Sequence, residues 1–167
     1  MERHVFIPTK GRYSDIGKLC DVWLNKAFSV HLVVEPHEAD RYAINSPSEV
    51  EKLVMDRGNA GVAYARAYAV GRAHYRGLKS IILADDDIKP STRRPDGMGE
   101  ILEACEHPKI MGMTARYSYH DLCLGPEIKY MDDIILLPTG TFRLVGLNVD
   151  NVMNVLGNYD ATLEYAE

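Results

Sequence analysis

Apolar runs alternate with amphipathic stretches over the first half of the chain. Residues 4–8, 30–34 and 81–84 are short and mostly apolar, which is typical of buried strands. Between them, residues 16–23 and 62–73 place apolar side chains at the spacing of one helix face. Strands that alternate with helices predict an α/β fold with a mostly parallel sheet and right-handed crossovers.

The pattern is harder to interpret elsewhere. Residues 48–55 fit a helix or a strand, and both interpretations stay open. In the second half we expect a loop at 91–99, a short helix at 100–105, strands beginning at 110 and 134, a hairpin partner at 138–145 and a helical turn at 159–164.

Composition narrows the class of protein. The chain has 167 residues and a net charge of −5, so no global basic field attracts nucleic acid. Its three cysteines, Cys20, Cys105 and Cys123, are widely spaced and form no C-x-x-C motif, which argues against a disulfide framework and a cysteine zinc site. No apolar run reaches the roughly 20 residues that span a bilayer, and the charged N-terminus does not resemble a signal peptide. We therefore expect a cytoplasmic protein without a membrane partner.

Three carboxylates, Asp85, Asp86 and Asp87, directly follow the apolar run at 81–84. Ligands of open α/β sheets bind beyond the carboxyl ends of strands. If the segment is extended, Asp85 and Asp87 point to one side and can share a hard divalent cation. A solvated turn or a helix N-cap is the alternative. The basic segment 89–94 that follows favours a metal and phosphate site.

Other polar groups follow other predicted strands. Thr9, Lys10, Gly11 and Arg12 form a cationic turn, although it lacks the spacing of a P-loop. Glu35 ends the second strand. Arg66 lies near the N-terminal end of the helix predicted after the Asn59–Gly61 turn, where backbone N–H groups favour anions; an ordinary surface arginine is the alternative.

The order of these signals resembles a known family. The series runs Pro8-Thr9-x-x-Arg12, Glu35, Asn59-x-Gly61, Ala65-Arg66, Gly77 and Asp85-Asp86-Asp87. Over residues 4–88 it resembles the GT-A nucleotide-sugar glycosyltransferases. Val34-Glu35-Pro36 and the segment 83–88 are most similar to the TET-associated glycosyltransferases, a group linked to phage DNA hypermodification and to sugar transfer onto hydroxymethylated pyrimidines.

The resemblance implies a GT-A-like, Rossmann-type three-layer α/β/α domain with a mostly parallel central sheet. It implies a single domain, 1–167, with a nucleotide-sugar-binding half at 1–88 and a short acceptor-side half at 89–167. The implied donor is a nucleotide-sugar, for which we expect a UDP-sugar. Its implied contacts are Pro8, Thr9, Lys10, Arg12, Glu35, Arg57, Asn59, Arg66 and Asp86, with Asp85 and Asp87 as a D-x-D pair that holds Mn²⁺ or Mg²⁺ on the diphosphate.

The chain departs from the family pattern on the acceptor side. The implied catalytic base is an acid, for which the candidates are Asp132, Asp133, Asp160 and Glu164. A histidine that completes the metal shell is expected late in the chain, whereas His120 lies upstream of that place. Two other functions therefore stay open: a nucleotidyltransferase, which also uses metal-binding acids on a parallel sheet, and a non-catalytic nucleotide-sugar-binding module.

If the acceptor is modified DNA, an acidic protein must hold it through a local basic surface. The candidates are Lys89, Arg93 and Arg94, with Arg116 and Lys129 as further ones. Phosphate contacts would make binding salt-sensitive. An alternative role for the first three is to contact the donor diphosphate alone. The sequence predicts no oligomeric state.

Overall fold

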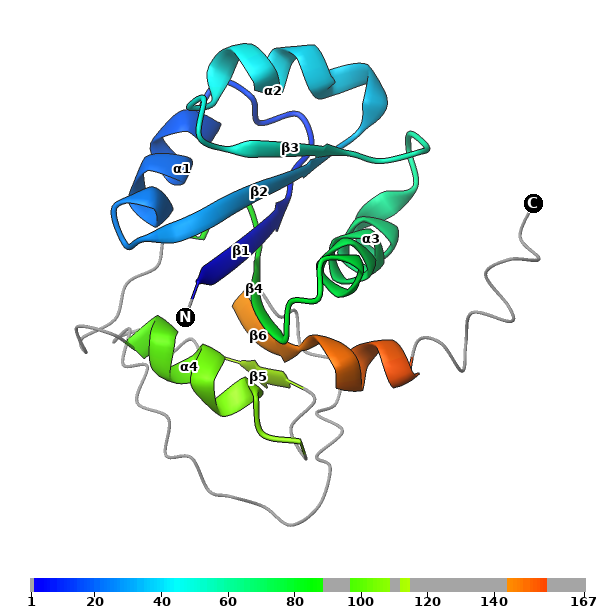
Figure 1. Cartoon of the computed structure of the whole chain (residues 1–167). Coiled ribbons are helices and arrows are strands. Elements are labelled where there is room, and N and C mark those ends of the chain that lie inside the picture. The colour runs from blue at the N-terminus through cyan, green and yellow to red at the C-terminus, as the bar shows by residue number, and fades with distance from the viewer. Residues whose placement is uncertain (1, 89–96, 109–111, 115–143, 156–167) are drawn as a thin grey trace, which may run out of the picture.

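The computed structural model describes residues 2–88, 97–108, 112–114 and 144–155 of the chain (Figure 1). Along the chain the elements are β1 (Arg3–Pro8), α1 (Ile16–Leu24), β2 (Phe28–Val34), the 3₁₀ turn η1 (Pro36–Glu38), α2 (Ala39–Asn45), β3 (Glu51–Val54), α3 (Gly61–Tyr75), β4 (Ser80–Ala84), α4 (Gly97–Cys105), β5 (Gly112–Thr114) and β6 (Leu144–Asn148). Residues 149–155 continue from β6 as a helix. None of the described helices is both long and apolar enough to cross a bilayer.

The described strands form one sheet in the order β3-β2-β1-β4-β6-β5. β3, β2, β1 and β4 run parallel, and Val5 of β1 pairs with Val30 on one side and Ile82 on the other. The carboxyl ends of these four strands therefore share one edge of the sheet. Ligand sites in open parallel sheets lie at this edge, so Glu35 and the three aspartates lie where such a site forms.

β6 runs against its neighbours. It is antiparallel to β4, so that Leu144 at its start pairs with Ala84 at the end of β4. β5 is antiparallel to β6, and Thr114 at its end pairs with Val145. Consequently β5 ends and β6 begins at the edge that carries the aspartates.

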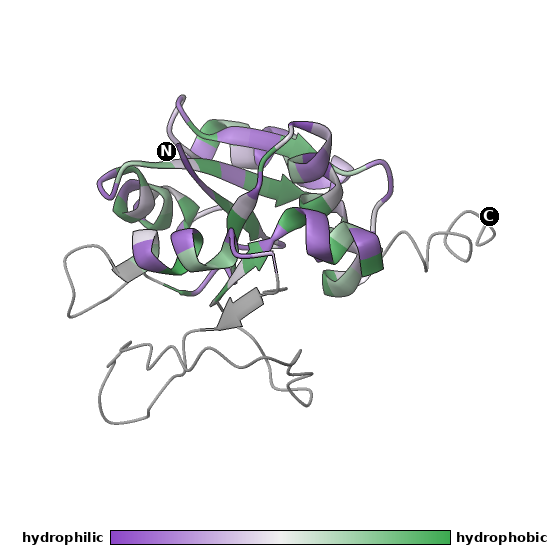
Figure 2. Ribbon diagram, turned by 60° about the horizontal axis from the view of Figure 1, so that its bottom comes forward, coloured by the Kyte–Doolittle hydropathy of each residue, from purple (hydrophilic) through white to green (hydrophobic). Residues whose placement is uncertain are grey.

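The sheet has helices on both faces, which confirms the expected α/β fold. Alternate residues of a strand point to opposite faces: Val5 and Ile7 pack in the cluster that contains α1 and α4, whereas Phe6 packs in the cluster that contains α3. Figure 2 shows hydrophobic residues gathered along the strands and the inner helix faces, with hydrophilic residues outside.

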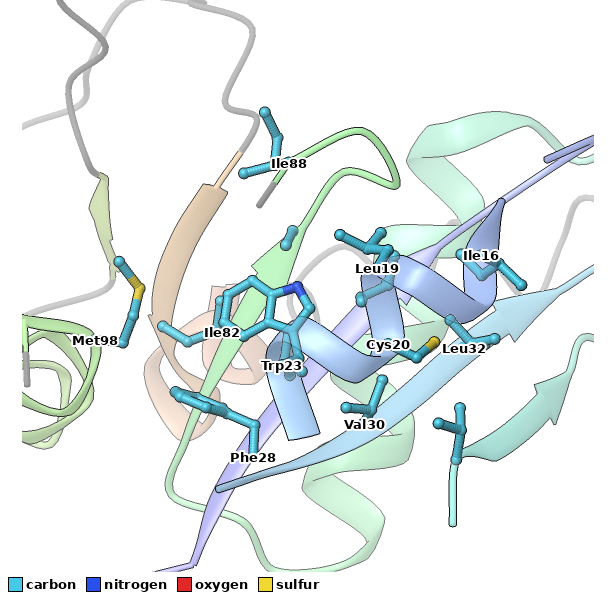
Figure 3. Packing of buried hydrophobic residues seen from close by; sticks show 14 of the residues in the cluster. Ile16, Leu19, Cys20, Trp23, Phe28, Val30, Leu32, Ile82, Ile88 and Met98 are labelled. Carbon is cyan, nitrogen blue, oxygen red and sulfur yellow. The ribbon is translucent and has the colours of Figure 1, made fainter. Parts of the chain in front are cut away.

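Trp23 is at the centre of the larger cluster. It comes from α1, is fully buried, and meets Phe28 edge-on at a ring-centroid distance of 5.1 Å. Figure 3 shows its indole lying between Ile82 and Leu19. The helical spacing of the apolar residues in 16–23 predicts a core-facing stripe, and the structure confirms it.

Gly146 allows α4 to approach β6 closely. A Cβ atom at this position would overlap the Cγ2 atom of Ile101 and lie 3.0 Å from the Sγ atom of Cys105. Because both neighbours belong to α4, the missing side chain sets the distance between that helix and the sheet.

The structure differs from the expected elements at two places, and other expected elements lie outside the described residues. The ambiguous stretch 48–55 contains the edge strand β3 and no helix. The loop expected at 91–99 is too long, because α4 already begins at Gly97. The strand expected from 134, the start of its hairpin partner and the helical turn at 159–164 lie outside the described residues.

A chain of polar side chains crosses the α3 face of the sheet. His4 Nδ1 lies 3.0 Å from His31 Nε2, and His31 Nδ1 lies 2.7 Å from Glu51 Oε2. Both imidazoles are buried, and the Arg76 guanidinium donates to both oxygens of Glu51. Burial lowers the pKa of both histidines, whereas the hydrogen bonds from Arg76 lower the pKa of Glu51 to about 2.

We expect the free energy of unfolding to fall as the pH is lowered from 7 to 5. The unfolded histidines take up protons near pH 6.5, but the folded ones, with lowered pKa values, do not, so protons favour the unfolded state. The slope is at most about 1.4 kcal/mol per pH unit for each histidine. Glu51 stays ionised in the folded state across this window, and its own contribution is lost only at lower pH.

Urea unfolding at several pH values measures this slope. His31→Asn should make the slope shallower, leaving the contribution of His4. An unchanged slope in His31→Asn would contradict the assignment.

Candidate active site

The loop after β1 is fixed by its neighbours. The backbone N–H of Thr9 donates to Val33 O at 3.1 Å, which extends the pairing with β2. Thr9 Oγ1 is 2.9 Å from Tyr42 OH, which also accepts from the backbone N–H of Arg12 at 3.1 Å. Gly11 has a φ of +72°, which glycine adopts readily, and its N–H points at both Glu38 oxygens, each at 3.1 Å. The cationic turn is therefore held by hydrogen bonds to β2, η1 and α2.

Glu35 is a buried carboxylate at the end of β2, with only 3% of its surface exposed. Lys10 Nζ donates to Glu35 Oε1 and to Asn59 Oδ1, both at 2.9 Å. Asn59 reaches this position from the β3–α3 loop with a φ of +56°, a conformation that asparagine tolerates. The hydrogen bond from Lys10 holds the pKa of Glu35 below its ordinary value, so the carboxylate is ionised.

The second oxygen of Glu35 is not satisfied. Oε2 is buried and accepts no hydrogen bond from the described residues; His37 Nδ1 lies 3.5 Å away. An ionised buried oxygen without a donor is costly, and such groups call for a specific explanation. A ligand that donates a hydrogen bond would provide one.

The aspartates lie in a turn, and not in the extended segment that would point Asp85 and Asp87 to one side. The N–H of Ile88 donates to Asp85 O at 3.1 Å and closes the turn. Asp85 faces α3, where its Oδ1 accepts from Arg66 Nη2 at 2.6 Å. Asp86 turns to the β1 loop, where Oδ2 accepts from Thr9 at 2.9 Å and Oδ1 lies 3.4 Å from Arg12 Nε. The side chain of Asp87 is exposed.

Most of the residues that we expect to contact the nucleotide-sugar lie at one edge of the sheet. Lys10, Glu35 and Asn59 meet at one place, and Arg12 meets Asp86 at another. Arg57 does not join them: its guanidinium lies 4.8 Å from the centre of the Tyr64 ring and 3.7 Å from Asp56. Pro8 ends β1 just before the loop.

The remaining candidates lie outside the described residues. These are the base candidates Asp132, Asp133, Asp160 and Glu164, the basic residues Lys89, Arg93, Arg94, Arg116 and Lys129, and His120.

Sequence reasoning overlooked three residues here. Tyr42 and Glu38 are buried and hold the β1 loop, and His37 lies beside Glu35. Glu38 is three residues after Glu35, so a turn at Pro36 places both acids on the same side; this spacing is the signal that could have found it. Tyr42 gives no comparable signal.

The carboxylates of the described residues fit only one type of site for a hard divalent cation. Within the described residues, no three acidic, histidine or cysteine side chains gather to hold a metal by themselves. Mg²⁺ commonly uses one or two carboxylates and takes its other ligands from substrate phosphates and water. Both Asp85 and Asp87 lie in the turn at this edge of the sheet, and a site of that type needs only one of these carboxylates, so it does not depend on the extended geometry.

Comparison with known proteins shows the family of the chain. The family model "TET-Associated Glycosyltransferase" matches residues 3–110. The chain belongs to this family. The match contains the β1 loop, Glu35, Asn59, Arg66 and the turn formed by Asp85–Ile88, which we call the acid turn, and it ends before β5. Comparison of this glycosyltransferase-family chain with curated protein sequences gives no match.

Solved structures give a more distant likeness. A 4-diphosphocytidyl-2C-methyl-D-erythritol synthase is 12% identical with a TM-score of 0.50, over 89% of this chain and 76% of that one. A protein described as mannose-1-phosphate geranyltransferase from Thermus thermophilus is 13% identical with a TM-score of 0.46, over 64% of this chain. The TET-associated chain spans 39% of the length of the latter. At this identity the likeness to the synthase concerns the fold alone.

Proposed function

We propose that this glycosyltransferase moves a sugar from a UDP-sugar to a hydroxyl group on a hydroxymethylated pyrimidine in DNA, with Mn²⁺ or Mg²⁺ on the donor diphosphate. The observation that carries the proposal is the convergence of Glu35 and the acid turn at one sheet edge, each already paired with a cation. One group suits a nucleobase and the other suits a metal and a diphosphate.

The Glu35 cluster supports a uracil base. The ring edge of uracil presents an acceptor, a donor and a second acceptor in a row. Glu35 Oε2 is a buried acceptor that needs a donor, and the ring N–H of uracil is such a donor. The Lys10 ammonium beside Glu35 is a further donor, which suits a carbonyl oxygen of the base.

The acid turn supports a diphosphate nearby. Asp85 and Asp87 would hold the metal, which as a Lewis acid offsets the charge that develops on the leaving diphosphate. Arg66 would bind a phosphate oxygen through its planar guanidinium. Thr9 and Arg12 hold Asp86, which would orient the ribose or the sugar. Asp132, Asp133, Asp160 or Glu164 would act as the base on the acceptor hydroxyl.

The test is sugar transfer to DNA that contains 5-hydroxymethylcytosine or 5-hydroxymethyluracil. The protein is incubated with the DNA, Mn²⁺ and each of several UDP-sugars. The DNA is then digested to nucleosides, and the masses of the nucleosides are measured by mass spectrometry. We expect a nucleoside heavier by one sugar residue, no product with EDTA, and none on unmodified DNA.

Two results would point elsewhere. Formation of a nucleotide-sugar from a sugar phosphate and a nucleoside triphosphate would make the chain a nucleotidyltransferase. Tight UDP-sugar binding without any transfer, to DNA or to a small hydroxylated acceptor, would make it a binding module.

A further inference from the structure

Arg66 occupies one oxygen of a carboxylate that the proposed function assigns to the metal. Asp85 Oδ1 accepts a hydrogen bond from Arg66 Nη2 at 2.6 Å, which makes this one of the short ion pairs at the sheet edge. Both side chains are about one-third exposed, at 32% and 30%, so solutes can reach them. A divalent cation on Asp85 would stand beside the guanidinium and be repelled by it.

The acid turn is held in place without Arg66. The hydrogen bond from the Ile88 N–H to Asp85 O closes the turn, and Asp86 is tied to Thr9 and Arg12. Because the backbone is anchored on this other side, the Asp85 carboxylate can change partners while the turn keeps its shape. Arg66 lies on α3, a separate element, and can turn to another anion.

A diphosphate supplies that anion. Its oxygens accept paired hydrogen bonds from a guanidinium at least as well as a carboxylate does, and they also ligate the cation. When metal and diphosphate arrive together, each of the four charged groups gains a partner. When the metal arrives alone, Arg66 is left beside it.

We propose that the Arg66–Asp85 ion pair is an exchange switch, an inference that rests on the proposed function. Without donor, Arg66 occupies the metal ligand. When the nucleotide-sugar and the metal bind, the Asp85 carboxylate binds the metal ion and the Arg66 guanidinium binds the diphosphate. The switch suppresses binding of the metal alone and couples the two ligands, so each raises the affinity for the other by the same factor.

The test compares Arg66→Gln with the wild type, using Mn²⁺ alone and then UDP at saturating Mn²⁺. Free Mn²⁺ is counted by electron paramagnetic resonance, and UDP binding is measured by calorimetry. We expect Arg66→Gln to bind Mn²⁺ alone roughly fivefold to tenfold more tightly, because its competitor is gone. The same variant should bind UDP with Mn²⁺ roughly tenfold more weakly.

The opposite signs of the two changes are the decisive readout, because a damaged fold would weaken both. Arg72→Gln is the matched control: it removes another arginine of α3, one in the last turn of the helix that lies over the Tyr75 ring, and it should change neither affinity. If Arg66→Gln leaves the affinity for Mn²⁺ alone unchanged while the wild type binds UDP with Mn²⁺, the switch is wrong and the proposed function stands. If Mn²⁺ does not affect UDP binding by the wild type, the metal-dependent function is wrong, and the switch is wrong with it.

Discussion

Replacing Asp85 and Asp87 together with asparagine is expected to slow sugar transfer by at least about a hundredfold. A metal on a leaving diphosphate is worth several kcal/mol of transition-state stabilisation, and each 1.36 kcal/mol is about tenfold in rate. Asparagine keeps the size of the side chain and can still accept the hydrogen bond from Arg66, so the fold should persist. The measurement is the initial rate of transfer at saturating Mn²⁺, together with thermal unfolding.

Asp56→Asn serves as the control for this double variant. Asp56 is also an acid near the carboxyl end of a parallel strand, but its side chain is 60% exposed and it contacts Arg57 and Tyr64. Its replacement should leave the rate within about twofold of the wild type, since surface changes rarely matter. If the double variant keeps the wild-type rate and its response to Mn²⁺, these carboxylates do not hold the metal.

Replacing Trp23 with alanine is expected to lower the free energy of unfolding by about 3–5 kcal/mol. The indole is fully buried, and a cavity of this size is among the most destabilising changes in a core. It would lie between α1 and the sheet, where Trp23 packs against Phe28. Chemical denaturation at neutral pH, followed by circular dichroism, measures the loss.

Trp23→Phe keeps an aromatic ring at this position. The Nε1–H of Trp23 is buried and has no hydrogen-bond acceptor among the described residues, so phenylalanine removes a costly donor as well as part of the ring. We expect it to be less destabilising than alanine by at least about 2 kcal/mol. Equal losses in the two variants would mean that the aromatic ring contributes little.

The apolar pattern predicted two kinds of element. β1, β2 and β4 are nearly continuous buried runs, and α1 and α3 are helices that pack through one apolar face each. β3 was ambiguous because it is an edge strand in which only Leu53 is buried. The antiparallel insertion of β6 between β4 and β5 could not be predicted, because the strand–helix alternation that predicts parallel neighbours does not continue as far as β6.

The candidate site also has a part that the sequence predicted and a part that it did not. The rule that ligands bind at the carboxyl ends of parallel strands correctly brought Glu35 and the aspartates to one edge. Which basic side chain pairs with which acid depends on the conformation of the loops. Loop conformation leaves no periodic pattern in the sequence, so these pairs could not be predicted. Only the structure shows the ion pairs Lys10–Glu35, Arg12–Asp86 and Arg66–Asp85. It also shows a turn at the aspartates, where an extended segment was expected.

The pairing of β6 has a consequence for protein engineering. Because Thr114 lies across from Val145, and Leu144 lies across from Ala84, the interval 115–143 leaves the described fold and returns to it at one edge, next to the acid turn. A foreign segment spliced in between Thr114 and Leu144 would therefore have both of its ends fixed at this edge, while the register of β3, β2, β1 and β4 stayed as it is.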